Sequence, residues 1–112
     1  MLRNDSLVVM VFGVFDGLHQ GHVYFLRRAK ALGGKLIAVI ARDSATKNLK
    51  KHSPRLSERE RVRILRRIGI PSQVVLGDTR VSSWAVLIKH RPDVIALGYD
   101  QKKLKENLIA SR

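Results

Sequence analysis

The sequence VVMVFGVFDGLHQGH at residues 8–22 contains a strand, a sharp turn and the start of a helix. Its first half lies in a continuous apolar run, 7–12, that is rich in β-branched residues and typical of a strand covered on both faces. Gly13, Gly17 and Gly21 then recur every four residues, where the backbone must turn sharply or let another group approach closely. A helical pattern begins beside the last of these glycines.

Two histidines stand at the start of this helical pattern. His19 and His22 are three residues apart, so both can project from one side of the first helical turn. The N–H groups and the positive dipole end of such a turn favour phosphate. The stretch therefore predicts a phosphate site, with a purely structural glycine turn as the alternative. A transition-metal site is a weaker alternative, because no third His, Cys or nearby Glu completes it.

Length and composition predict one small globular domain. The chain has 112 residues, of which 45% are hydrophobic, and it has no cysteine, which excludes disulfides and thiolate zinc sites. The first six residues carry an acid and do not resemble a signal peptide, and the longest apolar run is far below the ~20 residues of a membrane span. We therefore expect a cytoplasmic protein that does not enter a membrane.

The net charge is unusually high. Twenty-two Lys and Arg against nine Asp and Glu give +13, which attracts nucleic acid or nucleotide phosphates. The helix expected from residue 57 carries five arginines, but they scatter around it without interleaved aromatic residues. Nucleic-acid binding is therefore the competing function that we rank last. The five arginines are Arg59, Arg61, Arg63, Arg66 and Arg67.

Helical and apolar β patterns alternate along the rest of the chain. Gly33-Gly34 ends the first helix, residues 42–56 read as a long basic loop, and Ser57 with Glu60 forms a capping box. This order predicts an α/β fold with a doubly wound parallel sheet, whose ligands bind beyond the carboxyl ends of the strands. Helices are expected at 22–32, 57–67 (with Val62, Leu65 and Ile68 facing inward), 83–90 and 102–110, and further strands at 35–41, 72–76 and 94–97.

Four segments resemble one known family. Residues 13–22 closely resemble the G-x-F-D-x-x-H-x-G-H signature of the cytidylyltransferase-like nucleotidyltransferases. Residues 41–47, ARDSATK, look like the family segment with a phosphate-binding lysine, and 57–61, SERER, resemble the helix start that follows it. Residues 91–101, RPDVIALGYDQ, are close to the K-P-D-x-I-x-L-G-x-D-Q segment of the archaeal-type FAD synthase and glycerol-3-phosphate cytidylyltransferase branch.

The resemblance implies a Rossmann-like nucleotidyltransferase. In this family an acceptor phosphate attacks the α-phosphorus of ATP or CTP, and pyrophosphate leaves without a covalent enzyme intermediate. The last of the four segments favours ATP with FMN, giving FAD. CTP with a phosphorylated alcohol is the alternative, followed by an inactive nucleotide-binding protein. Mg²⁺ would arrive bridging the nucleotide phosphates, with few protein ligands. The resemblance leaves a homodimer open.

The same resemblance implies the site residues. His19, His22 and Lys47 would be catalytic, and Lys47 and Arg59 would neutralise the triphosphate and the departing pyrophosphate. Each has a structural alternative: Lys47 as a solvated loop lysine, Arg59 as a partner of the neighbouring glutamates, and Asp100 as a turn residue. Asp16, the acid nearest the signature, either braces the turn or faces magnesium. The nucleotide-binding set is Val14, Phe15, His19, Gly21, His22, Arg59 and Asp100.

Two departures from the family pattern are visible. Val14 stands where many members have Thr, so a hydroxyl contact to the nucleotide is lost. The sequence ends at Ser111-Arg112, before the family's last strand and its I-S-T-S-type segment. We therefore expect one nucleotidyltransferase domain over residues 1–112 without the family's C-terminal segment, and the sequence leaves open whether it is a fragment or a reduced member.

Overall fold

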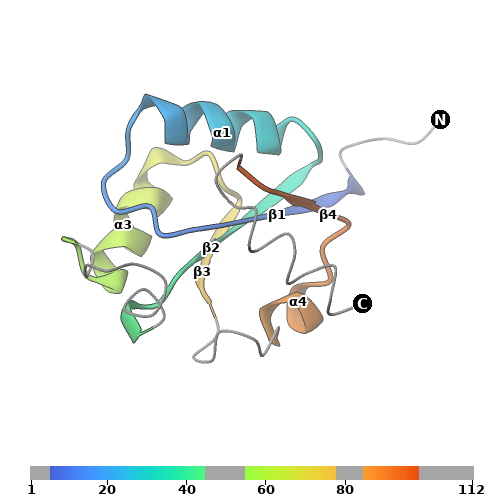
Figure 1. The fold of residues 1–112 in the computed structure, drawn as a ribbon. Helices are drawn as coiled ribbons and strands as arrows, with labels where there is room; N and C mark the ends of the chain where they lie inside the picture. Colours follow the sequence, from blue (N-terminus) through green and yellow to red (C-terminus); the bar gives the residue numbers. More distant parts are fainter. Residues whose placement is uncertain (1–5, 45–54, 78–84, 99–112) are drawn as a thin grey trace.

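The computed structural model describes residues 6–44, 55–77 and 85–98. Figure 1 shows a central sheet with helices on its two faces. The strands are β1 (Val8–Gly13), β2 (Lys35–Ile40), β3 (Gln73–Leu76) and β4 (Val94–Ala96), and the helices are α1 (Gln20–Lys30), α3 (Glu58–Ile68) and α4 (Ala85–His90).

The sheet is parallel, with strand order β3-β2-β1-β4. β1 lies in the middle, and its Val9 pairs with Leu36 of β2 on one side and with Val94 of β4 on the other. The strand order reverses between the pair β2–β3 and β4, which is the switch point where ligands bind in open α/β sheets. The predicted doubly wound parallel sheet is confirmed.

Alternate residues of the strands build two cores. Val9, Val11 and Leu36 point to the face that α1 and α3 cover, where they meet Leu26 and Leu65. On the other face Met10, Ile37 and Val39 pack against Val86 and Leu87 of α4. Because the central strands are covered on both sides, their sequences are apolar at nearly every position, as the run at 7–12 predicted.

The structure differs from the predicted helices and loop at several positions. α1 begins at Gln20, two residues before the predicted start, because the side chain of His19 caps it. The long loop expected directly after β2 is wrong at its start, since Asp43 and Ser44 are helical. Ile68 does not face inward: it is 37% exposed in the last turn of α3, where Gly69, with φ of 73°, turns the chain toward β3. The helix predicted at 102–110 lies outside the described residues.

The arginines of α3 do not scatter around the helix. Arg61 turns inward and is only 1% exposed, whereas the other four are exposed. Those four stand at positions i, i+4, i+7 and i+8, which lie on one side of a helix. The expectation of scatter fails because it counted the one buried arginine together with its exposed neighbours. The exposed set is Arg59, Arg63, Arg66 and Arg67.

None of the helices in the described part of the chain is both long and apolar enough to cross a membrane.

Candidate active site

The site is built on the turn that joins β1 to α1. Phe15 adopts φ of 53°, a left-handed conformation that is rare for an aromatic residue and costs of order 1–3 kcal/mol. Its ring is buried in the core, and a Cβ at residue 13 would lie 2.7 Å from the ring, so the strand must end in Gly13. The turn is therefore held in a strained backbone by the burial of Phe15.

The ring of Phe15 lies in the core, so its predicted contact with a nucleotide stays a prediction for the backbone alone. The ring belongs to the same core cluster as Val11 and Leu26. It also contacts the ring of His22, with centroids 5.6 Å apart and an interplanar angle of 59°. Phe15 thus supports the imidazole of His22 from the side of the core.

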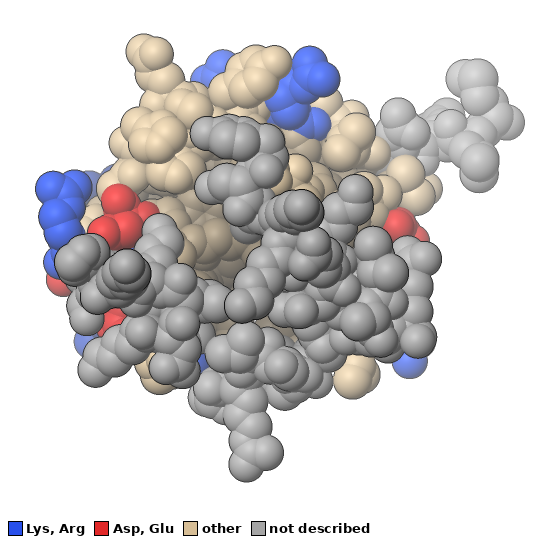
Figure 2. All heavy atoms as spheres, in the orientation of Figure 1, with Lys and Arg blue, Asp and Glu red and all other residues tan. Residues whose placement is uncertain are grey.

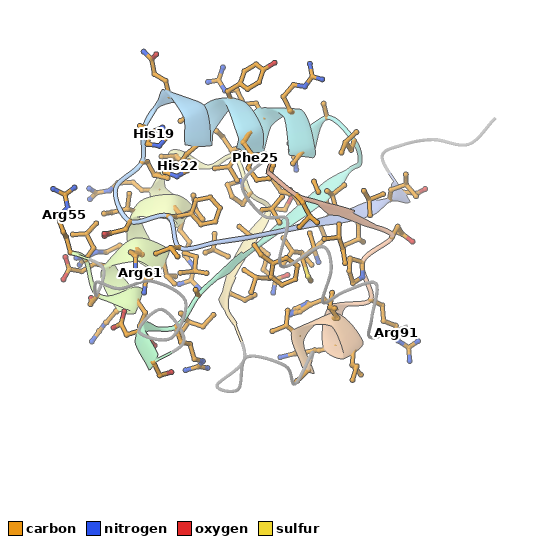
Figure 3. All side chains as sticks on the ribbon, viewed as in Figure 1. His19, His22, Phe25, Arg55, Arg61 and Arg91 are labelled. Atoms are coloured by element: carbon orange, nitrogen blue, oxygen red, sulfur yellow. The ribbon has the colours of Figure 1, made fainter. Side chains whose placement is uncertain are left out.

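His19 and His22 are held by the first turn of α1. Nδ1 of His19 accepts a hydrogen bond from the N–H of Gly21 (3.0 Å), and Nδ1 of His22 accepts one from the N–H of His19 (3.3 Å). The two rings stack with centroids 3.8 Å apart, and Figure 3 shows them side by side at the start of the helix. The histidines themselves thus form the reciprocal cap that Ser and Glu form in other helices.

These backbone bonds determine where each neutral imidazole carries its proton. A ring nitrogen that accepts a hydrogen bond cannot also be protonated, so both histidines carry the proton on Nε2. Each Nε2–H is therefore a donor at the positive end of a helix dipole, and the first turn of α1 contains no acidic residue. The arrangement suits an anion with several oxygens, such as a phosphate.

Gly21 is required by the position of the His19 ring. A Cβ on residue 21 would lie 2.8 Å from Cε1 and 3.0 Å from Nδ1 of His19. Any larger residue would push the imidazole away from the helix start. Steric contact with the His19 ring thus explains why residue 21 is a glycine.

Asp16 ties the turn to the segment that precedes α3. Its two carboxylate oxygens accept hydrogen bonds from the N–H groups of Arg55 (2.8 Å) and Leu56 (2.9 Å). These two backbone bonds, with smaller contributions from the charges of Arg55 and Arg61, lower the pKa of Asp16 below its usual value of 3.8. Asp16 thus braces the turn through N–H groups 39 and 40 residues later in the chain, and not, as predicted, through the N–H groups that follow it.

Arg61 is a functional residue that the sequence analysis missed. Its guanidinium is buried and donates to the carbonyls of Val14 (2.9 Å) and Ala41 (2.8 Å), while its Nε donates to the carbonyl of Leu56 (3.1 Å). Nη2 also forms an ion pair with Asp43 at 2.6 Å. One side chain therefore joins the end of β1, the end of β2 and the entry to α3, which together surround the site.

The ARD segment after β2 completes this network. The N–H of Asp43 donates to Glu58 (2.9 Å), and the N–H of Glu58 donates to Asp43 (3.2 Å), so each carboxylate caps the other residue's backbone. Arg42 Nε donates to the carbonyl of Gly77 after β3 (2.7 Å), and Arg42 Nη1 lies 3.8 Å from Oε2 of Glu58. The segment thus fastens the carboxyl ends of β2 and β3 to α3.

The remaining predicted residues divide into two groups. The structure brings Val14, Phe15, His19, Gly21 and His22 together at one turn, where the Val14 carbonyl is held by Arg61. The side chain of Arg59 is exposed in the first turn of α3 and makes no hydrogen bond or ion pair with another described residue. Lys47 and Asp100 lie outside the described residues, so their predicted roles stay predictions.

Arg55 is a second residue that sequence reasoning missed. Its Nη2 lies 3.3 Å from the position that a Cβ on Gly17 would occupy, so the guanidinium stands over the glycine turn. In Figure 3 its side chain extends from the loop before α3 on the same side of the molecule as the two histidines. The only sequence signal was its place in the basic segment before Ser57, which does not distinguish it from its neighbours.

Comparison with known proteins agrees with this geometry. The model of the family described as Cytidylyltransferase-like matches residues 10–108. A FAD synthase of Pyrococcus abyssi is 42% identical over 112 residues, covering 96% of this chain and 76% of that protein, and a FAD synthase of Methanosarcina barkeri is 43% identical over 101 residues, covering 89% and 70%. The solved structure of a lipopolysaccharide core biosynthesis protein from Thermoplasma volcanium superposes with a TM-score of 0.85 at 35% identity, covering 94% of this chain and 84% of that one.

Proposed function

The chain belongs to the cytidylyltransferase-like family and is a nucleotidyltransferase, and on this premise we propose that it transfers AMP from ATP to FMN, forming FAD and pyrophosphate. The choice of ATP and FMN is supported by the relatives named FAD synthase, which match most of this chain. The transfer of CMP from CTP to a phosphorylated alcohol is the competing reaction.

The observation that carries the proposal is the pair of Nε2–H donors at the start of α1. His19 and His22 are both fixed by backbone N–H groups, so their donors are oriented before the nucleotide arrives. An oriented donor stabilises charge that develops in the transition state without the cost of reorganising solvent. We assign the two imidazoles to the oxygens of the α- and β-phosphates.

The reaction needs positioning more than a chemical nucleophile from the protein. An oxygen of the FMN phosphate forms a bond to the α-phosphorus of ATP, the bond from that phosphorus to the bridging oxygen of the β-phosphate breaks, and pyrophosphate leaves with the electron pair. The acceptor is already an anion, so no side chain has to remove a proton. His19 and His22 would stabilise the charge that gathers on the phosphoryl oxygens.

We propose supporting roles for the other residues. Lys47 and Arg59 would neutralise the departing pyrophosphate, and Asp100 would contact the nucleotide at the carboxyl end of β4. Val14 and Phe15 would contribute backbone groups. These roles are supported by the family pattern, and for Arg59 also by an exposed side chain without a partner in the described residues.

Magnesium would be carried by the nucleotide. Within the described residues no group of three or more His, Asp or Glu could hold a metal ion. Both carboxylate oxygens of Asp16 already accept backbone hydrogen bonds. We propose that Mg²⁺ bridges the phosphates of the nucleotide and takes few ligands from the protein, as is common for this ion.

A product assay with separate substrate pairs tests the proposal. The chain is incubated with MgCl₂ and either ATP with FMN or CTP with glycerol 3-phosphate, and FAD, CDP-alcohol and pyrophosphate are each measured by chromatography. We expect FAD and pyrophosphate in equal amounts from the first pair. CDP-glycerol from the second pair with no FAD from the first would refute the choice of substrates and leave the reaction class intact.

A further inference from the structure

The outer surface of the α1–α3 layer carries six exposed arginines. α1 covers β1 and β2, and α3 covers β2 and β3 on the same face of the sheet, so the two helices are neighbours. The outward side of α1 presents two arginines, and that of α3 presents the four described above. We call this surface the arginine face; its members are Arg27, Arg28, Arg59, Arg63, Arg66 and Arg67.

The charge of the arginine face is hardly neutralised by the rest of the described chain. The two ion pairs between described residues join Arg42 to Glu58 and Arg61 to Asp43, and neither involves a member of the arginine face. α1 has no acidic residue at all, and the only exposed acid on α3 is Glu60 in its first turn. Along the top of Figure 2, over α1, Lys and Arg atoms lie without Asp or Glu atoms beside them.

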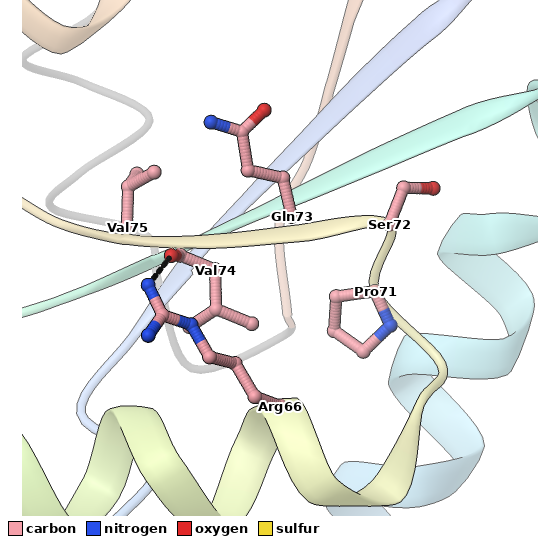
Figure 4. A pocket seen from close by; sticks show the side chains of 6 residues that line it. All are labelled: Arg66, Pro71, Ser72, Gln73, Val74 and Val75. Atoms are coloured by element: carbon pink, nitrogen blue, oxygen red, sulfur yellow. Dashed lines mark hydrogen bonds between the residues drawn. The ribbon is translucent and has the colours of Figure 1, made fainter.

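Arg66 is the member of the face whose guanidinium is hydrogen-bonded to another described residue. Its Nη2 donates to the carbonyl of Val74 on β3 (3.1 Å), and Figure 4 shows the side chain extending from the end of α3 across the strand. This hydrogen bond uses one of the five N–H donors of the guanidinium and does not neutralise its positive charge. The face therefore extends from α3 toward the β3 side of the sheet.

Apart from Arg59, which we also assign to the departing pyrophosphate, the arginine face is separate from the candidate active site. The histidines stand at the N-terminus of α1, whereas Arg27 and Arg28 lie in its last turn, and Arg66 and Arg67 lie in the last turn of α3. The phosphates of one nucleotide held at the helix start thus leave the cations at the far ends of both helices without a ligand. A net charge of +13 favours binding of polyanions, so these cations suit a second kind of anion.

We propose that the arginine face binds the phosphate backbone of double-stranded nucleic acid. Arginine presents a planar fork of donors that matches phosphate oxygens, so a surface built from arginines favours phosphate over a general cloud of anions. From Arg59 to Arg67 the α3 stripe extends about 12 Å, the length of two helical turns, which is enough to contact successive phosphates of one strand.

Two other partners fit the surface less well. A single strand is bound through stacked aromatic residues, and Tyr24, which is 66% exposed and lies 5.8 Å from the guanidinium carbon of Arg28, is the one exposed aromatic on the described parts of α1 and α3. A membrane-surface helix turns its apolar face outward, but the apolar faces of both helices pack on the sheet. The duplex needs neither feature.

Fluorescence anisotropy with short labelled duplexes of mixed sequence, one of DNA and one of RNA, tests the proposal. The variant R63Q/R67Q removes two charges from the face, and the control K35Q/K89Q removes two exposed charges from other surfaces. For R63Q/R67Q we expect the slope of log K against log salt to fall by about two and the Kd near 100 mM salt to rise about tenfold or more. The control should move both quantities far less.

Several outcomes would overturn the proposal. One is the absence of binding to either duplex at 50 mM salt; another is an equal loss of affinity in R63Q/R67Q and K35Q/K89Q, which would mean that only net charge matters. Equally tight, equally arginine-dependent binding to phosphatidylserine vesicles or polyglutamate would also refute it. Urea unfolding of each variant checks folding, and R27Q/R28Q on α1 serves as the second variant if R63Q/R67Q does not fold.

Discussion

Replacing Arg61 by methionine should destabilise the protein far more than the same change at any exposed arginine of α3. Methionine keeps the aliphatic length of the side chain but removes the guanidinium, and with it the hydrogen bonds to the carbonyls of Val14, Ala41 and Leu56. It also removes the ion pair between Arg61 and Asp43. Among the described residues, the substitution thus removes the one side chain that donates hydrogen bonds to all three of these backbone segments.

The magnitude follows from the burial of the two partners. Removing one partner of a buried ion pair typically costs about 3–5 kcal/mol, much of it from groups left unpaired. The Asp43 side chain is 42% exposed and keeps its bond to the N–H of Glu58, so water and that bond reduce its share. The lost hydrogen bonds to the three carbonyls raise the cost again, because a hydrogen bond from a charged donor contributes about 1.5–3 kcal/mol. We therefore expect the free energy of unfolding to fall by about 3–4 kcal/mol.

Urea unfolding of R61M, with R63M as the matched control, measures this difference. Arg63 is on the same helix, is exposed, and makes no bond with another described residue, so R63M should lie within about 0.5 kcal/mol of the wild type. A domain of this size should lose roughly 4 °C in Tm for each kcal/mol. If R61M and R63M differ by less than about 1 kcal/mol, the reasoning that Arg61 holds the site together is wrong.

Three further predictions concern the turn itself. H19N should keep the thermal midpoint, because asparagine caps a helix well, but it should lower kcat about 10²–10³-fold because it removes the Nε2–H donor. H19A should lose both turnover and about 1 kcal/mol of stability. Steady-state kinetics and thermal melting of the two variants therefore separate the catalytic role of His19 from its capping role. G21A should reduce nucleotide affinity in calorimetry while circular dichroism remains unchanged, because its Cβ would displace the His19 ring, and wild-type affinity would contradict the steric argument. The pKa of Asp16 is lowered in the folded state, so the Asp16 carboxylate contributes its full stabilisation of the fold above pH 3.8 and loses it as pH falls through the lowered pKa. The difference in urea midpoint between wild type and D16N should therefore shrink on acidification below pH 3.8. A constant difference would show that Asp16 does not titrate with folding.

Local sequence patterns predicted the strands and the strand-to-helix turn on which the candidate site is built. The apolar run at 7–12, the glycines after it and the paired histidines all act through neighbouring residues, so they could be identified without a structure. The parallel order of the sheet followed from the alternation of helix and strand, which topological rules restrict strongly. The strand boundaries in the described residues differ from the predicted ones by one residue at most.

Long-range polar contacts could not be predicted in the same way. The burial of Arg61 depends on carbonyls that lie 47 and 20 residues earlier in the chain, and no periodicity of the sequence shows that they converge. The arginine face was missed for the same reason, because the other arginines of α3 lie on one side of the helix only when the buried Arg61 is left out. The reciprocal cap of His19 and His22 was missed for another reason: imidazole is not a usual capping group, so its pattern suggested ligand binding alone.

His19 both caps α1 and carries the Nε2–H donor that we assign to phosphate, and this combination limits how the protein can be engineered. Serine, aspartate and asparagine are better helix caps than most residues, so a search for thermostable variants that scores only melting temperature would favour them at position 19. Each of these replacements removes the donor on Nε2, and aspartate would add a negative charge where we place phosphate. A library built for stability should therefore hold position 19 fixed or be screened with nucleotide present, because at this residue a gain in melting temperature and the loss of turnover would come from the same substitution.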